Sequence, residues 1–156
     1  MADETLEIRA ARPEDAATII DFQLRMARET EGLELPFDTV QRGVEAVFAD
    51  PGKGAYWLAE NTEDAGRIVG CLLTTFEWSD WRDGTVLWIQ SVYVVPEARG
   101  RGVYRALHEH LRKRVESSPD LKGLRLYVDL RNTAAQRVYE RMGMSREHYA
   151  LYEWLK

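Results

Sequence analysis

Apolar residues follow two kinds of pattern along the chain, one typical of helices and one typical of strands. In residues 11–32, apolar residues such as Ile20 and Leu24 recur at helical spacing between Pro13 near the start and Gly32 at the end, a pattern typical of an amphipathic helix. The same signals predict further helices over residues 37–50, 100–117 and 132–143. Short apolar runs bounded by turn residues predict strands over residues 6–11, 55–61, 66–78, 85–95, 123–130 and 145–156.

The order of these elements is strand, two helices, three strands, helix, strand, helix and strand. Polar turns separate the three consecutive strands, which favours an antiparallel run. A length of 156 residues fits one domain. We therefore predict a single mixed α/β (α+β) domain over residues 1–156, with a mixed central sheet of about six to seven strands flanked by about four helices.

Composition narrows the class of protein. Apolar residues make up 45% and charged residues 30% of the chain, and no run approaches the ~20 apolar residues that span a membrane. The net charge of −5 argues against a surface that binds nucleic acid. Cys71 is the only cysteine and lies among apolar residues, so we expect a buried thiol and no disulfide within the chain. The acidic start MADETLEIRA lacks the features of a secretory signal, and a cytoplasmic location is expected.

The segment VYVVPEARGRGVYRALHEHL, residues 92–111, joins a strand to a helix through Pro96 and two glycines. Such a junction exposes backbone N–H groups that have no partner within the helix, and the helix dipole adds to their attraction for anions. Three arginines at the junction contribute positive charge; they are Arg99, Arg101 and Arg105. A phosphate or pyrophosphate group is therefore a reasonable ligand.

Other interpretations of these glycines remain open at this point. No Lys-Ser or Lys-Thr follows them, as a P-loop would require, and Arg105 stands where the dinucleotide-binding motif has its third glycine. A plain basic turn with solvated arginines would fit the same residues. A turn that binds RNA by stacking Tyr93 and Tyr104 on bases would fit them too, but the acidic net charge argues against it.

Two motifs resemble those of the GNAT family of N-acetyltransferases. Residues 92–107 are similar to the family's acetyl-coenzyme A signature, a strand followed by [Q/R]-x-x-G-x-[G/A] and a helix. Arg99, Gly100 and Gly102 fit this motif, and Tyr104 departs from it. The segment NTAAQRVYERMGM, residues 132–144, resembles the later N-x-x-A-x-x-x-Y-x-x-x-G-[FM] motif. The predicted order of elements also resembles the family fold across nearly the whole chain.

This resemblance implies acetyl-CoA as cosubstrate and a set of residues around it. Backbone groups of Val92, Tyr93 and Val94 are expected to meet the pantetheine arm and the reaction's oxyanion. The pyrophosphate loop is expected to comprise Arg99, Gly100, Arg101, Gly102, Val103, Tyr104 and Arg105. Asn132 is expected to contact the cofactor arm, and Tyr139 to donate a proton to the leaving thiolate.

Asn132 and Tyr139 are seven residues apart, which places them on one stripe of a helix. A tyrosine with a pKa of about 10 is protonated at neutral pH and can serve as an acid. Taken alone, Asn132 also fits a helix N-cap, and Tyr139 fits a half-buried packing residue.

The acceptor side of the site carries weaker signals. The hairpin EWSDWRDG, residues 77–84, combines tryptophan with acidic residues, as a cation-binding surface does, although packed tryptophans in a solvent-facing hairpin fit as well. The substrate candidates are Glu29, Trp78, Asp80 and Gln90. Gln90 stands where some family members, including polyamine acetyltransferases, have a glutamate base. The base therefore stays open among Glu77, Asp80, Asp83, Tyr127 and Asp129.

No metal site is expected. The rings of His108 and His110 point about 200° apart on a helix, which does not suit one metal ion, and we expect them on the surface or in a groove.

The function that these features indicate is direct acetyl transfer from acetyl-CoA to a primary amine of a small, cationic molecule. The alternative is a catalytically weak module of the same fold that binds acyl-CoA as a sensor or regulator. Neither nucleic acid nor membrane is expected as a partner. By resemblance alone, a homodimer through the C-terminal strands is expected.

Overall fold

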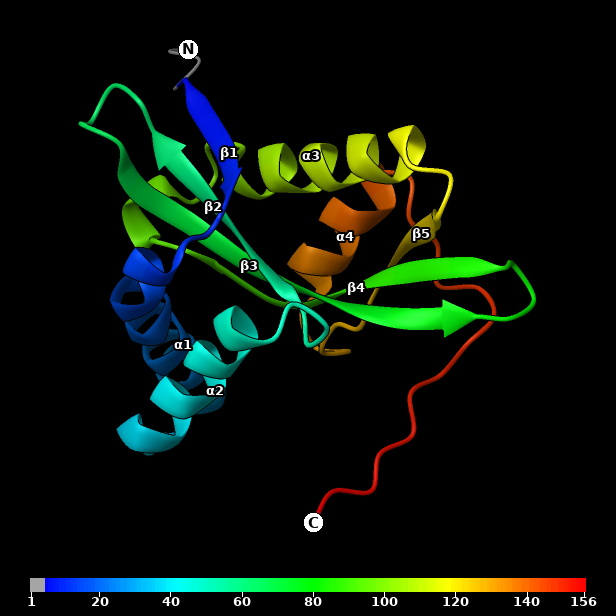
Figure 1. The fold of residues 1–156 in the computed structure, drawn as a ribbon, viewed down its shortest axis with the longest axis horizontal. Helices are drawn as coiled ribbons and strands as arrows, with labels where there is room; N and C mark the ends of the chain where they lie inside the picture. Colours follow the sequence, from blue (N-terminus) through cyan, green and yellow to red (C-terminus); the bar gives the residue numbers. More distant parts are fainter. Residues whose placement is uncertain (1–4) are drawn as a thin grey trace. The chain divides into compact units, whose positions relative to one another are not determined.

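The computed structural model describes residues 5–156, so the first four residues of the acidic start lie outside it. The chain forms two compact units, of which the first ends at Arg125 and the second runs from Leu126 to Lys156. The elements, in chain order, are β1 (Leu6–Ala10), η1 (Pro13–Asp15), α1 (Ala16–Glu31), α2 (Phe37–Ala49), β2 (Ala55–Asn61), β3 (Arg67–Ser79), β4 (Gly84–Val94), η2 (Pro96–Ala98), α3 (Val103–Ser117), β5 (Leu121–Leu126) and α4 (Thr133–Arg141) (Figure 1).

The sheet has five strands in the order β1-β2-β3-β4-β5. The first three pairs of neighbours are antiparallel, as predicted for residues 55–95. β5 follows β4 through α3, and the amide of Thr85 donates to the carbonyl of Asp120 at 2.8 Å. Because the two strands begin side by side, they run in the same direction. The mixed α/β class is confirmed.

The strand count was predicted too high. β5 ends at Leu126 rather than at residue 130, and residues 145–156 form no strand. Aromatic and β-branched residues favour a strand only where a neighbouring strand completes the hydrogen-bond ladder. The apolar pattern of residues 145–156 could not show that such a neighbour is lacking within the described chain.

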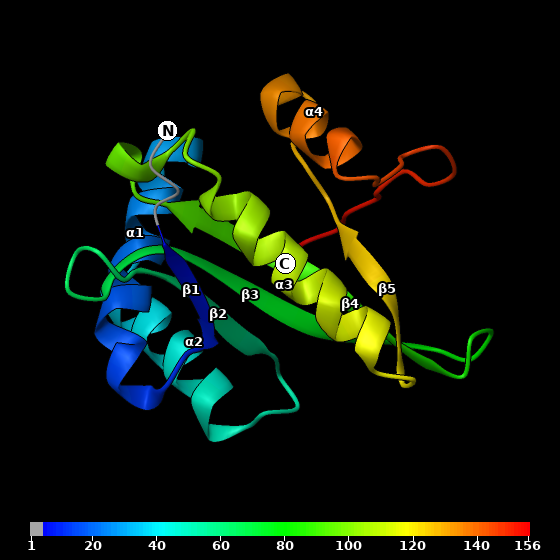
Figure 2. The ribbon, with the colours of Figure 1, turned by 90° about the horizontal axis from the view of Figure 1, so that it is seen from above.

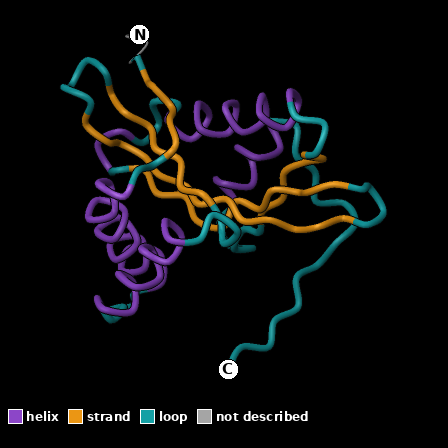
Figure 3. Tube along the Cα trace, in the orientation of Figure 1, coloured by secondary structure: helices purple, strands orange, loops and turns teal. Residues whose placement is uncertain are grey.

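Helices cover both faces of the sheet (Figure 3). Successive residues of β2 point to opposite faces: the Trp57 ring lies 5.1 Å from His110 of α3, and the Tyr56 ring lies 5.9 Å from Phe48 of α2. Figure 2 shows α3 lying along the sheet. Side chains alternate in this way along any β-strand, and here the alternation places Tyr56 and Trp57 against two different helices.

A close approach at Gly70 fixes α3 against β3. A Cβ atom on Gly70 would lie 2.7 Å from Cγ1 of Val103, the first residue of α3. Val103, Leu107 and Leu111 are at most 2% exposed. The packing thus anchors the N-terminus of α3 close to the sheet, where the glycine junction begins.

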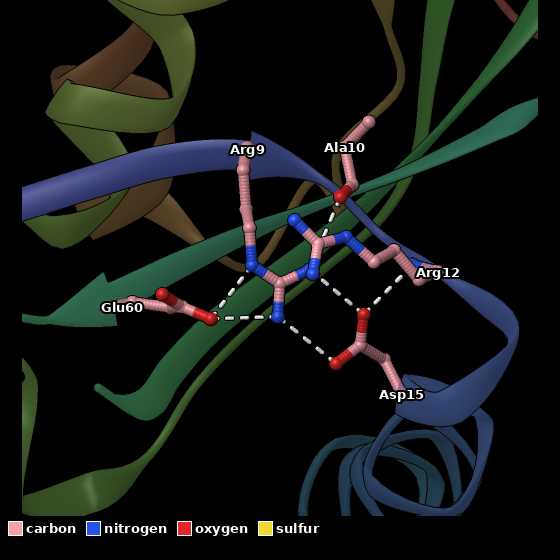
Figure 4. A network of polar contacts seen from close by, with 5 residues as sticks. All are labelled: Arg9, Ala10, Arg12, Asp15 and Glu60. Atoms are coloured by element: carbon pink, nitrogen blue, oxygen red, sulfur yellow. Dashed lines mark hydrogen bonds and ion pairs between the residues drawn. The ribbon is translucent and has the colours of Figure 1, made fainter. Parts of the chain in front are cut away.

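An arginine network joins β1, β2 and the start of α1 (Figure 4). Nη1 and Nη2 of Arg9 donate to Asp15 at 2.8 and 3.0 Å, and its Nε donates to Glu60 at 2.6 Å. Asp15 also accepts from the Arg12 amide at 2.7 Å. These hydrogen bonds lower the pKa of Asp15 and keep it ionised.

The histidines of α3 are more buried than expected. His108 is 2% exposed, and its Nδ1 lies 3.2 Å from the Tyr104 hydroxyl one turn earlier. His110 is half-buried against Trp57, and its Nε2 has no hydrogen-bond partner among the described residues. The expectation of a surface or groove position was wrong for His108, because the apolar stripe of α3 is wide enough to include it.

Acidification below about pH 6.5 is expected to destabilise the fold through these two histidines. Burial lowers the pKa of each, so the unfolded chain, with histidine pKa values of about 6.5, binds more protons as the pH falls. The free energy of unfolding should then drop by at most about 1.4 kcal/mol per pH unit for each histidine, until the pH passes the lowered folded pKa.

Urea unfolding at several pH values below about 6.5 measures how steeply the free energy of unfolding falls with pH, that is, its slope. His108→Gln should flatten it, and His148→Gln should not, because the His148 side chain is 77% exposed. An unchanged slope in His108→Gln would show that His108 does not contribute to the loss of stability on acidification.

Two further expectations concern Cys71 and the membrane. Cys71 is 1% exposed, which confirms the predicted buried thiol, and burial raises the pKa of this thiol to about 12. Within residues 5–156, the helices lack the combination of length and apolar character needed to cross a bilayer.

Candidate functional site

The glycine junction forms a loop between the end of β4 and the start of α3. Gly100 and Gly102 adopt φ angles of 74° and 80°, which lie in the left-handed region. Gly102 is also the N-cap of α3 and has no side chain to accept from the helix's first amides. The loop therefore leads the backbone directly into an uncapped helix N-terminus.

The space beside both glycines is open. A Cβ atom built on Gly100 or Gly102 would meet no heavy atom within 4 Å. The amides of the first turn of α3 and the positive end of its dipole make this a suitable place for an anion. Arg101, between the glycines, is exposed.

Arg99 and Arg105, two of the predicted phosphate-binding arginines, donate hydrogen bonds to acidic side chains of the protein. Arg99 donates through Nη2 to Glu29 at 2.6 Å and through Nε to the Val94 carbonyl at 2.9 Å. Arg105 donates to Glu109 one turn along α3 at 2.8 Å. The sequence indicated the positive charge of Arg99 and Arg105 but not their acidic partners. Glu29, the partner of Arg99, is 70 residues away from it in the sequence.

Side chains of other predicted cofactor residues belong to the core. Tyr93 and Val103 are 3% and 2% exposed, while Val92 and Val94 are half-buried. A ligand at these positions would meet backbone groups, as the resemblance implies. Tyr104, which departs from the family motif, is half-buried along α3 beside His108.

Gln90 marks an irregularity in β4 that the sequence did not reveal. Ser91 faces Leu73 and Ile89 faces Thr74, so Gln90 is an extra residue in the ladder, a β-bulge. Its Nε2 donates to the Thr75 hydroxyl at 2.8 Å. Bulges are frequent beside active sites because they redirect side chains.

Some of the residues predicted to bind a cation are exposed on the β3–β4 hairpin. The Trp78 side chain is 65% exposed, and Asp80 in the turn is exposed as well. The carboxylate of Glu77 is paired within the protein, because both its oxygens accept hydrogen bonds from Arg125.

The second unit contains the remaining predicted residues. Asn132 is the N-cap of α4, with its Oδ1 accepting from the Ala135 amide at 3.1 Å. Tyr139 is half-buried on α4, and burial raises the pKa of its phenol. Asp129, one candidate base, is held by Arg131 with its pKa lowered to about 2, so it binds a proton poorly at neutral pH.

Gln136 is a residue of this unit that the sequence analysis missed. It is 8% exposed, donates to the carbonyls of Asp129 and Leu130, and accepts from Arg146 at 2.6 Å. It links the loop before α4 to the segment after it. A polar residue within an amphipathic helix gives no such signal in the sequence.

Comparison with known proteins assigns the family. The model of the acetyltransferase (GNAT) family matches residues 18–144, which is most of the chain. The chain therefore belongs to the GNAT family.

Individual relatives agree with this assignment. A possible acetyltransferase from Clostridium difficile 630 is 38% identical, with a TM-score of 0.88 and coverage of 97% of each chain. A mycothiol acetyltransferase of Thermobispora bispora is 35% identical over 119 residues, which are 70% of this chain and 35% of that protein. The chain thus spans about a third of the length of that relative. An aminoglycoside N-acetyltransferase in complex with CoA shares the fold at 15% identity, covers 97% of this chain and 95% of its own, and has a TM-score of 0.76.

Proposed function

We propose that the protein is an acetyl-CoA-dependent N-acetyltransferase that transfers the acetyl group directly to a primary amine. The observation that carries this proposal is the loop of two left-handed glycines at the uncapped N-terminus of α3, in a chain of the GNAT family. The family model runs across the boundary between the two units, which supports a single acetyltransferase domain.

The proposed reaction assigns a task to each group. Backbone groups of residues 92–94 receive the cofactor arm and stabilise the oxyanion that forms when the amine attacks the thioester. The acceptor attacks as the neutral amine, and its nitrogen loses one proton to water. As the intermediate collapses, the carbon–sulfur bond breaks, Tyr139 donates its proton to the leaving thiolate, and water returns a proton to Tyr139. Its raised pKa supports this role, because the phenol stays protonated at neutral pH. Asn132 would contact the cofactor arm through the part of its amide not used in capping.

The proposed acceptor is a small cationic amine. Support comes from the exposed Trp78 ring and the neighbouring Asp80, which suit a cation by ring-face attraction and by charge. Gln90, on the bulge of β4, is the proposed polar contact from the sheet.

Calorimetric titration with acetyl-CoA, followed by thiol-release assays on a panel of amines, tests the proposal. The panel should include polyamines, amino acids, aminoglycosides and mycothiol-related amines. We expect one-to-one binding at micromolar concentrations and turnover with at least one cationic amine. Binding without turnover would instead favour the acyl-CoA sensor, and absence of binding would reject both functions.

We also propose that the protein forms a homodimer through its C-terminal segment. Leu151, Trp154 and Leu155 lie close together in the sequence and are 56%, 89% and 80% exposed, and large apolar side chains exposed in one segment are suited to burial in an interface. Sedimentation analysis of the chain and of the Trp154→Glu variant measures the oligomeric state. A monomeric wild-type chain would reject the dimer.

A further inference from the structure

The end of α1 reaches the cofactor loop through one carboxylate. Glu29, in the last turn of α1, accepts a hydrogen bond from the Tyr93 hydroxyl at 2.9 Å on Oε1 and from Arg99 at 2.6 Å on Oε2. Tyr93 is on β4, and Arg99 immediately precedes the first glycine of the loop. Glu29 therefore connects three segments that meet beside the predicted cofactor site.

Arg99 transmits this contact to the backbone of β4. Its Nε donates to the carbonyl of Val94, the last residue of that strand, at 2.9 Å. Because a guanidinium group is planar and rigid, fixing one side by Glu29 also fixes the direction of the other. The position of the Val94 carbonyl and the start of the loop thus depend on Glu29.

The Tyr93 ring, whose hydroxyl donates to Glu29, is fixed by the side chains packed around it. It is 3% exposed, with the Phe22 ring at 5.0 Å and the guanidinium carbons of Arg25 and Arg99 at 5.3 and 5.6 Å from its centroid. The hydroxyl that donates to Glu29 is consequently held by a packed ring. Both groups that donate to Glu29, the Tyr93 hydroxyl and the Arg99 guanidinium, belong to the predicted cofactor set.

The charge state of Glu29 limits the roles that this residue can have. The hydrogen bonds from Arg99 and then from Tyr93 lower its pKa, so it is ionised at neutral pH and is a weak proton acceptor. An ionised carboxylate beside two arginines is also largely neutralised, which makes it a poor anchor for a cationic acceptor. These properties suit a residue that orients others.

We infer that Glu29 is a positioning residue of the cofactor site, acting through Arg99 and Tyr93 to set the conformation of residues 94–100. This inference rests on the proposed function, because its consequence is acetyl-CoA affinity. It assigns Glu29 to the cofactor side of the site, whereas the sequence placed it with the acceptor.

A double-mutant cycle on Glu29 and Arg99 tests the inference. The dissociation constant for acetyl-CoA, measured by calorimetry, should rise about 5-fold to 10-fold in Glu29→Gln and similarly in Arg99→Ala. The double variant should be no weaker than the worse single variant, because both substitutions break one linkage. KM for acetyl-CoA should rise with the dissociation constant while kcat stays within about 2-fold.

Two further variants separate positioning from general stability. Glu116→Gln removes a carboxylate that also pairs with an arginine, Arg112 at 3.1 Å on α3, and should leave affinity unchanged. Tyr93→Phe removes one partner of Glu29 while keeping the packed ring, and should weaken binding about 2-fold to 3-fold. Thermal unfolding of each variant shows whether affinity and stability change separately.

The outcomes distinguish the inference from the proposed function. If the wild-type chain binds acetyl-CoA and Glu29→Gln binds equally well or more tightly, the inference is overturned and the function stands. Tighter binding would mean that Glu29 withholds Arg99 from the phosphates. Additive losses in the double variant would also overturn it. If the wild-type chain does not bind acetyl-CoA, the proposed function fails and the inference fails with it.

Discussion

Gly102→Val is expected to raise the dissociation constant for acetyl-CoA at least about 10-fold, equivalent to about 1.4 kcal/mol. Two effects act together. Gly102 has a φ of 80°, and a β-branched residue is strained in that region by roughly 1–2 kcal/mol. The new side chain would also occupy the open space beside the loop, where the backbone must approach a phosphate. Calorimetric titration measures the change.

Gly66 offers a matched control for the strain alone. It has a φ of 74° in the turn between β2 and β3, and a Cβ atom there would meet only Glu60 Oε2, at 3.8 Å. Gly66→Val should lower the free energy of unfolding by an amount comparable to that in Gly102→Val, while acetyl-CoA affinity stays unchanged. Equal affinity in both variants would show that the phosphate loop is misplaced.

Tyr139→Phe is expected to lower kcat by roughly 100-fold, because general acid catalysis contributes about that much or more. The ring and its packing remain, so the dissociation constant for acetyl-CoA should change by less than about 2-fold. Steady-state thiol release combined with direct binding measurements separates the two quantities.

The pH profile adds an independent test of Tyr139. An acid must be protonated to act, so turnover that depends on Tyr139 is retained below its pKa and lost above it. Because burial raises that pKa above its ordinary value of about 10, any decline in kcat that the tyrosine causes should occur at a more alkaline pH than an ordinary tyrosine would give. Tyr152→Phe, which removes a hydroxyl from a side chain that is 93% exposed, is the control. Full activity in Tyr139→Phe would remove Tyr139 from the mechanism.

Several features of the fold could be predicted because they depend on neighbours in sequence. The short apolar run in residues 55–61 predicted a strand, which β2 confirms with the same bounds. The capping role of Asn132 was one of two predicted readings, and its side chain indeed accepts from Ala135. Each property arises from backbone geometry within a few residues.

Other features depend on partners that the sequence does not reveal. Residues 145–156 have the composition of a strand, but a strand also needs a hydrogen-bonded neighbour, and none is formed in the described chain. The bulge at Gln90 arises from the register between β3 and β4, which depends on how two strands pair. The burial of His108 follows from how closely α3 packs on the sheet.

The sequence by itself determined where the backbone turns and where most of the helices and strands lie, because hydrophobic period, glycine and proline act locally. It therefore indicated the Gly100–Gly102 junction and the mixed α/β class. Only the tertiary structure decided which charged groups face one another. Glu29 and Arg99 lie 70 residues apart, and their contact exists because α1 packs against β4 and brings a carboxylate to the edge of the loop. Coulombic and hydrogen-bond energies depend on distance in space, so the partners of an arginine can be known only once the chain has folded.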